Sequence, residues 1–230
     1  MMVDCGFSLR ETERRLATLG KQVTDITAVL VSHEHSDHIR GINPFIKKTG
    51  IPVWMTQGTR DGCKLSVGLS VNVFDRDESI EINDLSIDPF PMPHDANEPC
   101  QFVFNNGDKR LGILTDVGSE TPIIIDHLNA CDALLLECNH DEEMLSGSEY
   151  PAFLKQRILG DYGHFSNEQA ASLLQKLDCS DLQHIVALHL SEKNNDTQLV
   201  RQALSDVLDC EQDWIGVAEQ NVELQWRSIL

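Results

Sequence analysis

The chain carries little positive charge and has no long apolar run. Its 230 residues include 18 Lys and Arg against 37 Asp and Glu, a formal net charge of −19, which opposes non-specific binding to nucleic acid or an anionic membrane. No stretch approaches the about 18 consecutive apolar residues that a membrane span needs. The first residues also lack the basic and apolar regions of a signal peptide. We therefore expect a cytoplasmic protein that makes no membrane contact.

Cysteine is present but follows no pattern. The seven Cys residues are scattered, no two form a CxxC pair, and their number is odd. Neither a disulfide framework nor a thiolate zinc site is indicated. Metal ligands, if there are any, must be sought among imidazole and carboxylate groups.

The sequence also lacks internal repeats, low-complexity tracts and linkers rich in Pro, Gly or Ser. Short apolar runs alternate with amphipathic segments, and 41% of the residues are hydrophobic, as in an ordinary globular protein. We expect one domain over residues 1–230, of the α/β or α+β layered class.

Apolar periodicity and turn signals predict the individual elements. Helices are expected at residues 9–19, 44–49, 139–159, 167–177 and 197–208. Strands are expected at residues 26–31, 51–55, 71–74, 85–90, 101–105, 111–114, 133–138, 185–190 and 222–226. Asn43 and Pro44 have the form of an N-cap and a first helical residue, and Ser166 with Gln169 has the form of a capping box.

The most informative feature is the run HEHSDH at residues 33–38, which directly follows a short apolar stretch. A strand that ends in this loop places His33 and His35 on one side and aims Asp37 and His38 at a second position nearby. A lone His beside a strand end is ordinarily a surface or core-rim residue. Three His and one Asp within six residues, in a chain with only nine His, favour a metal site.

Three further residues stand where strands should end, namely His94, Asp116 and His189. Taken singly, His94 reads equally well as a loop residue, Asp116 as a turn former and His189 as an ordinary strand-end His. Their joint occurrence behind apolar runs favours ligand roles. Imidazole and oxygen ligands suit Zn²⁺ but also Mn²⁺ or Fe²⁺, so the sequence leaves the metal open.

The HxHxDH pattern resembles the signature of the metallo-β-lactamase-fold hydrolases. This resemblance implies a four-layer αββα fold in which two mixed β-sheets lie between layers of helices. It also implies two divalent metal ions. By the resemblance, metal one would be held by His33, His35 and His94, metal two by Asp37, His38 and His189, and Asp116 would bridge them.

Asp4, in the phrase VDCG, resembles the first motif of the same family, an Asp that orients the ligand loop through hydrogen bonds. A plain turn residue at a strand end is an equally good reading. Members of the family ordinarily have one or two strands before this Asp, whereas here the chain starts almost on it. The resemblance therefore implies a first sheet that lacks its usual first strands, or a shortened start, with an exposed sheet edge.

Two later phrases narrow the resemblance. ECNHD at 137–141 and GHFSN at 163–167, with DCGFSLRETERRL from residue 4, resemble the bacterial WalJ/YycJ subgroup, described as DNA exonucleases. Glu137 and His164 resemble a proton-donating pair of the phosphodiesterase branch that includes tRNase Z. Catalytic roles are thus implied for Glu137, His164 and Asp37. Read from the residues alone, Glu137 could instead be a helix-cap carboxylate, and His164 could sit beside a cap.

His140 and Asp141 belong to the first of these phrases. They could orient Glu137 or touch the substrate, and a surface position fits them equally well.

Two ions that share a carboxylate can supply hydroxide at neutral pH, so hydrolysis is the expected reaction. One reading is a phosphodiesterase or nuclease, in which Arg40, Lys47 and Lys48 contact phosphates, although these three could equally form a solvated helix face. The alternative is a small-molecule hydrolase acting on a cyclic phosphodiester, thioester or lactone, which the acidic composition favours. A non-enzymatic metal-binding module conflicts with the full ligand set. The uncovered cleft makes a dimer possible, but the sequence does not fix the oligomeric state.

Overall fold

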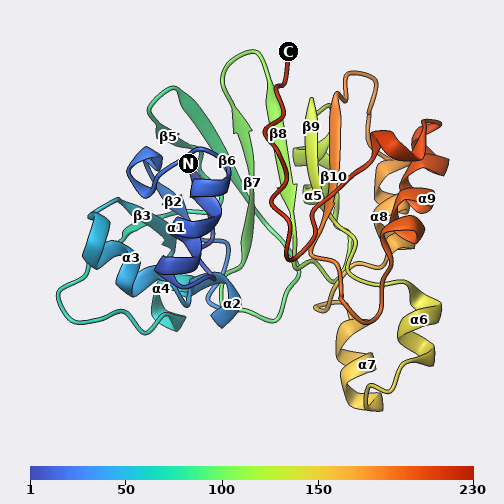
Figure 1. The fold of residues 1–230 in the computed structure, drawn as a ribbon, viewed down its shortest axis with the longest axis horizontal. Coiled ribbons are helices and arrows are strands. Elements are labelled where there is room, and N and C mark those ends of the chain that lie inside the picture. The colour runs from blue at the N-terminus through green and yellow to red at the C-terminus, as the bar shows by residue number, and fades with distance from the viewer.

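The computed structural model describes residues 1–230 and contains two β-sheets flanked by helices (Figure 1). The strands are β1 Met2–Val3, β2 Val29–Leu30, β3 Val53–Thr56, β4 Asn72–Phe74, β5 Ile80–Ile82, β6 Leu85–Pro91, β7 Cys100–Asn105, β8 Arg110–Leu114, β9 Ala133–Glu137, β10 His184–Leu188 and β11 Gly216–Val217. The α-helices are α1 Leu9–Thr18, α2 Ser36–Ile39, α3 Ile42–Thr49, α4 Gln57–Gly62, α5 Pro122–Leu128, α6 Glu142–Gly147, α7 Ala152–Ile158, α8 Asn167–Leu174 and α9 Thr197–Leu208.

The smaller sheet has the strand order β1-β2-β3-β4, and every neighbouring pair in it is parallel. This corrects the expectation of a mixed sheet here. Each connection between these strands passes through a helix, and such a crossover returns the chain in the same direction. Asp4, which follows β1, and Ser32, which follows β2, therefore lie at the same edge of the sheet.

The larger sheet has the order β11-β10-β9-β8-β7-β6-β5 and is mixed. The strands β5 to β8 are antiparallel to their neighbours, whereas β8, β9, β10 and β11 run parallel. The predicted hairpin is confirmed, with Phe102 opposite Ile113 and Asn105 opposite Arg110. Because β6, β8, β9 and β10 all point the same way, the residues that follow them meet at one edge.

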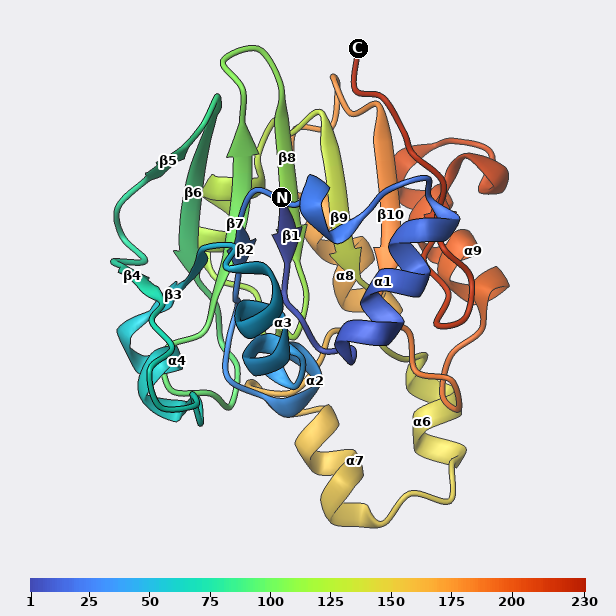
Figure 2. The same cartoon turned by 60° about the vertical axis from the view of Figure 1, so that its left-hand side comes forward.

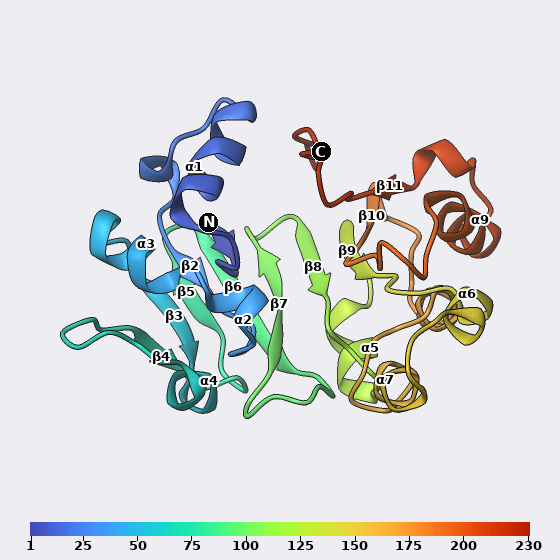
Figure 3. The ribbon, with the colours of Figure 1, turned by 60° about the horizontal axis from the view of Figure 1, so that its bottom comes forward.

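Three apolar cores separate four layers. Val29 and Phe45 belong to a core between the smaller sheet and the helices α1 and α3. Leu30 points the other way and packs with Phe102 between the two sheets. The largest core lies between the larger sheet and the helices α5, α8 and α9, which Figure 3 shows on the side away from the smaller sheet. The alternation along each strand thus produces the predicted αββα arrangement, which is confirmed.

Several predicted elements match closely. The helix at 197–208 coincides with α9, and Ser166 with Gln169 forms the predicted capping box at the start of α8. The helix expected at 139–159 is instead two short helices, α6 and α7. Pro151, which precedes α7, has no backbone N–H and restricts Tyr150, so one continuous helix cannot form.

Two other predicted elements are wrong. The helix α3 begins at Ile42 with Gly41 as its cap, so Asn43 is not the N-cap; its side chain instead bonds Lys64 O and Ser66 N. No strand forms at 222–226; the last strand is β11, which pairs with β10. Trp226, from the segment expected to be a strand, donates its indole N–H to Leu19 O instead.

The helices α6 and α7 form an arm that extends beyond both sheets, at the end of the molecule where α2 lies (Figures 1 and 2). This is the edge at which the strands bearing the predicted ligands end. Among all the helices of the structure, none has the length and apolar character needed to cross a membrane.

Candidate metal centre

Asp4 holds the loop that follows β2 through contacts with Ser32 and His38. One carboxylate oxygen, Oδ1, accepts the backbone N–H of Ser32 at 2.8 Å and is 3.0 Å from its hydroxyl, and Oδ2 lies 2.7 Å from Nδ1 of His38. Asp4 itself has a left-handed backbone with φ 59°. These contacts hold the loop and direct Nε2 of His38 toward Asp116. They fit the predicted role of Asp4 in orienting the ligand loop.

His33, His35 and His94 form the first group of candidate ligands, with nitrogens all within 4.8 Å of one another. Nδ1 of His35 lies 3.2 Å from Nε2 of His94, close to the about 3.3 Å that separates two nitrogens on one tetrahedral zinc ion. The ring of His33 lies 4.6 Å from that of His35 and 4.9 Å from that of His94.

The state of His33 fits a ligand role. Its ring is fully buried, Nδ1 lies 3.0 Å from the hydroxyl of Ser32, and Nε2 has no hydrogen-bond partner. A buried nitrogen without a partner costs free energy unless something binds it. Burial, together with the nearby His38, lowers the pKa of His33 to about 2, so the imidazole is neutral and its free nitrogen can bind a metal ion.

Asp116 belongs to two further groups of candidate ligands, one with His33 and His38 and one with Glu137, His164 and His189. His33, His38 and Asp116 offer donor atoms within 4.8 Å of one another, and Nε2 of His38 is 3.4 Å from Oδ2 of Asp116. Asp116 follows β8 in a left-handed conformation with φ 58°, and the hydroxyl of Thr115 donates to its Oδ2. Its other oxygen, Oδ1, is 3.6 Å from Nδ1 of His189. The carboxylate therefore reaches both groups.

Glu137 is fully buried at the end of β9 and joins two imidazoles. Its Oε1 accepts hydrogen bonds from Nδ1 of His164 at 2.9 Å and Nδ1 of His189 at 2.8 Å, and Oε2 accepts the N–H of Val117 at 2.8 Å. Burial alone would raise the pKa of Glu137, but the bonds and charges of His164 and His189 lower it. An ionised carboxylate accepts hydrogen bonds, so Glu137 can hold both imidazoles in place.

Asp37 and Arg40 lie at the mouth of the cluster. The Asp37 side chain is 69% exposed, and its Oδ2 is 3.7 Å from Nε2 of His38, so it borders the groups without joining them. Arg40 donates to Gly6 O at 3.2 Å. A Cβ on Gly6 would lie 1.4 Å from the carbonyl oxygen of Asp37. The close approach of these two backbone segments therefore requires glycine at position 6.

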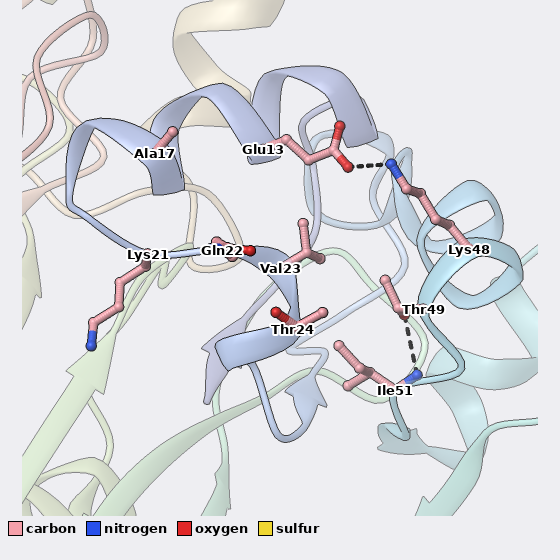
Figure 4. Close-up of a pocket in the computed structure, with 9 residues that line it drawn as sticks. All are labelled: Glu13, Ala17, Lys21, Gln22, Val23, Thr24, Lys48, Thr49 and Ile51. Atoms are coloured by element: carbon pink, nitrogen blue, oxygen red, sulfur yellow. Dashed lines mark hydrogen bonds and ion pairs between the residues drawn. The ribbon is translucent and has the colours of Figure 1, made fainter.

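The structure does not bring Lys47 and Lys48 to the cluster, which corrects their expected contact with phosphates. The helix α3 leads back from the metal loop to the start of β3, so both lysines lie at the opposite end of the smaller sheet. Lys48 pairs with Glu13 of α1, beside a surface hollow that Lys21 and Thr24 also line (Figure 4).

Neither His140 nor Asp141 is hydrogen-bonded to Glu137. Asp141 is the N-cap of α6 and accepts the N–H of Met144 at 2.8 Å. His140 is fully buried, and neither of its ring nitrogens has a partner. The full burial of His140 corrects the surface position that fitted it equally well, and no hydrogen bond from either residue supports the orienting role toward Glu137.

The sequence reasoning overlooked Asp95 and Arg157. The Asp95 carboxylate lies 3.4 Å from Nε2 of His94 and 3.7 Å from Nε2 of His35, and Arg157 donates to it at 3.0 and 2.8 Å. Burial would raise the pKa of Asp95, but Arg157 and His94 lower it. The available signal was an acidic residue directly after His94; nothing in the sequence pointed to Arg157.

A cluster of His and acidic side chains therefore lies where β1, β2, β6, β8, β9 and β10 end. Figure 3 shows the αββα sandwich that carries these strands. Its His and Asp side chains are positioned to bind divalent metal ions, the chemistry of a metal-dependent hydrolase. The fold and the cluster together define that class.

The chain belongs to the metallo-β-lactamase superfamily of hydrolases: residues 1–189 match the family described as "Beta-lactamase superfamily domain". It is 33% identical to exodeoxyribonuclease YycJ of Bacillus anthracis, over 95% of this chain and 84% of that one. It is 31% identical to exodeoxyribonuclease WalJ of Streptococcus pneumoniae, over 90% of this chain and 80% of that one. Among solved structures, the metallo-β-lactamase-fold protein YhfI of Bacillus subtilis superposes with a TM-score of 0.71 at 17% identity, covering 95% and 84% of the two chains. The predicted family and subgroup resemblance are thus confirmed.

Proposed function

We propose that this chain, as one domain over residues 1–230, is a dinuclear metal phosphodiesterase that shortens DNA. The observation that carries the proposal is a cluster in which two groups of candidate ligands share Asp116 and in which His164 is hydrogen-bonded to the buried carboxylate of Glu137. The two relatives named exodeoxyribonuclease cover nearly the whole chain and support DNA as the substrate.

The two metal positions would draw on seven side chains. His33, His35 and His94 would hold one ion, and Asp37, His38 and His189 the other, with Asp116 between them. The separation of 3.2 Å between His35 Nδ1 and His94 Nε2 and the partnerless Nε2 of His33 support the first position. The second is supported by the contacts of Asp116 with His38 and His189. The donor set suits Zn²⁺, Mn²⁺ and Fe²⁺.

When bound, the ions would supply Lewis acidity toward the phosphate oxygens and hydroxide at neutral pH. The chain's own residues would supply the proton for the leaving oxygen. His164 donates a hydrogen bond from Nδ1 to Oε1 of Glu137, which leaves Nε2 available, and its ring lies 5.5 Å from that of His94 and 5.3 Å from that of His189. The Glu137 carboxylate would stabilise the charged imidazolium and orient it, so Nε2–H is the proton donated.

One observation favours the second candidate, a small-molecule hydrolase of the same fold. The net charge of −19 repels long polyanions at low salt more than it repels a small ester. Two divalent ions would add about four positive charges at the cluster, which offsets this repulsion where the scissile phosphate binds.

The test compares substrates on the purified protein with Mn²⁺ or Zn²⁺ added. Labelled single-stranded and duplex DNA should shorten in a metal-dependent way, and Asp116→Asn should abolish the shortening. Hydrolysis of bis(p-nitrophenyl) phosphate should exceed that of p-nitrophenyl butyrate. Turnover of the carboxylic ester alone, with the DNA and bis(p-nitrophenyl) phosphate left intact, would reject the phosphodiesterase and support the small-molecule alternative.

A further inference from the structure

The arm between β9 and α8 exposes large apolar side chains beside the candidate metal centre. Phe153 is 72% exposed, Leu159 53% and Tyr162 63%. Burial of such groups is favourable, so an exposed cluster of them near a site commonly marks a contact surface. We propose that Phe153, Arg157 and Tyr162 form a surface, here called the arm face, that binds single-stranded nucleic acid entering the metal centre. This inference rests on the proposed function.

Arg157 fixes the arm face relative to the cluster. It lies on α7 and donates two hydrogen bonds to Asp95, the residue after His94. The guanidinium is thereby held beside the first ligand group, with its remaining N–H groups free to reach a phosphate. Phe153 precedes Arg157 by four residues, so both lie on one face of the helix. A strand bound at the metal centre would pass Arg157 first and Phe153 next.

Tyr162 lies in the turn that leads from α7 to His164. It precedes His164 by two residues, in a turn closed by hydrogen bonds from Gly163 N to Gly160 O at 2.8 Å and from His164 N to Ile158 O at 2.9 Å. The turn also packs on the segment after Asp116, where a Cβ on Gly118 would lie 2.3 Å from Gly163 N. Tyr162 is therefore exposed on a backbone that two neighbouring segments hold in place.

The segment that carries the arm face is the less acidic part of the arm. Residues 152–164 contain Lys155 and Arg157 against one acidic residue, Asp161, whereas residues 141–149 contain four acidic residues and no basic one. A strand that follows α7 is therefore repelled less than one that follows α6. Exposed aromatic rings beside a cation are the features by which proteins hold single strands, since every base has a face on which such a ring can stack. A duplex hides those faces, so the arm face should select unpaired strands.

Binding is measured with a labelled oligo-dT whose phosphorothioate linkages resist hydrolysis, using the metal-loaded protein. Phe153→Ala and Tyr162→Ala should each weaken binding by about fivefold or more, while Tyr162→Phe, which keeps the ring, should bind as the wild type does. Trp226→Ala is the matched control, because this exposed aromatic contacts α1 at Leu19, away from the arm. Metal content and the unfolding transition verify that each variant is folded.

An oligonucleotide of the same length without bases separates stacking from charge. The Phe153→Ala and wild-type proteins should bind it equally, and Arg157→Ala should bind it less well. If the wild type binds oligo-dT and the alanine variants bind it just as tightly, the arm face is refuted and the proposed function survives. The arm face is equally refuted if those variants alter only the sedimentation of the protein, since a second copy would then cover it. A wild type that binds no oligonucleotide refutes the nucleic-acid substrate as well.

Discussion

His164 and Glu137 are joined by a hydrogen bond of 2.9 Å between Nδ1 and Oε1, although 27 positions separate them in the chain. Glu137 ends β9 and is fully buried, whereas His164 stands at the end of the arm and is partly exposed. The bond therefore ties the arm to the larger sheet at the point where a proton would be delivered.

Replacing Glu137 with Gln should lower kcat by about a hundredfold or more, the range for losing a positioned proton donor. The amide keeps the shape but removes the charge that stabilises the His164 imidazolium. The measurement is the rate on bis(p-nitrophenyl) phosphate with its pH profile, beside the melting temperature. Glu143→Gln on the exposed side of α6 is the control and should keep wild-type kcat. An unchanged pH profile in Glu137→Gln would argue against the assigned role.

His164→Ala should lower kcat while the bound metal stays at its wild-type amount, because His164 is bonded to Glu137 and is not a ligand in the proposed set. Elemental analysis of the purified protein checks the metal, and initial rates check kcat. His33→Ala, which removes the imidazole with the partnerless buried nitrogen, should lose metal and serves as the comparison. Metal loss in His164→Ala would make that residue a ligand.

The fold could be predicted from the sequence wherever local pattern decides it. The helix α9 and the hairpin of β7 and β8 carry their own caps, periodicity and turn residues, so they match. The strand expected at 222–226 fails because a short apolar stretch does not reveal whether a sheet edge is available. The edge of β10 that faces away from β9 is occupied by β11. Trp226 instead donates its indole N–H to Leu19, at the end of α1.

The site was predictable to the extent that it follows strand ends. His33, His94 and Asp116 each come directly after an apolar run, and parallel strands bring such residues to one edge. Arg157 could not be found in this way. It reaches Asp95 only because α7 leads the chain back from the end of the arm toward the sheets (Figure 1), a tertiary contact between residues 62 positions apart. The prediction for Lys47 and Lys48 was wrong for a similar reason. They are close to the HEHSDH motif in sequence, but α3 runs away from the metal loop and carries them to the other end of the smaller sheet.

Asp4→Asn should weaken metal binding by about ten- to a hundredfold, the usual effect of losing a partner that orients a ligand. The left-handed backbone of Asp4 tolerates Asn, so the variant should fold. Its amide cannot reproduce the charged contact with Nδ1 of His38. Competition with a chelating dye measures the affinity, and Asp108→Asn in the exposed hairpin turn is the control. Wild-type affinity in Asp4→Asn would show that Asp4 only shapes the turn.

The two proposed metal positions should differ in how they respond to pH. Burial opposes a charge on His38 and His189, but Asp4 and Asp116 raise the pKa of His38 to about 11, and Asp116 and Glu137 raise that of His189 to about 9. In the metal-free protein both therefore hold a proton at neutral pH, which an ion must displace. Burial lowers the pKa of His33 and His94 instead, so the first position loses no proton from them.

Zinc titrations by calorimetry, repeated in buffers of different ionisation heat, give the number of protons released by each ion. Near neutral pH the tighter ion should bind without proton release from His33 or His94. The second ion should release up to two protons, from His38 and His189, and its affinity should rise as pH increases toward about 9. His189→Asn should reduce the release that accompanies the second ion, while Lys21→Met, beside the hollow between α1 and α3, should leave it unchanged. Equal proton release for both ions would show that the metal-free cluster does not carry its charge on His38 and His189.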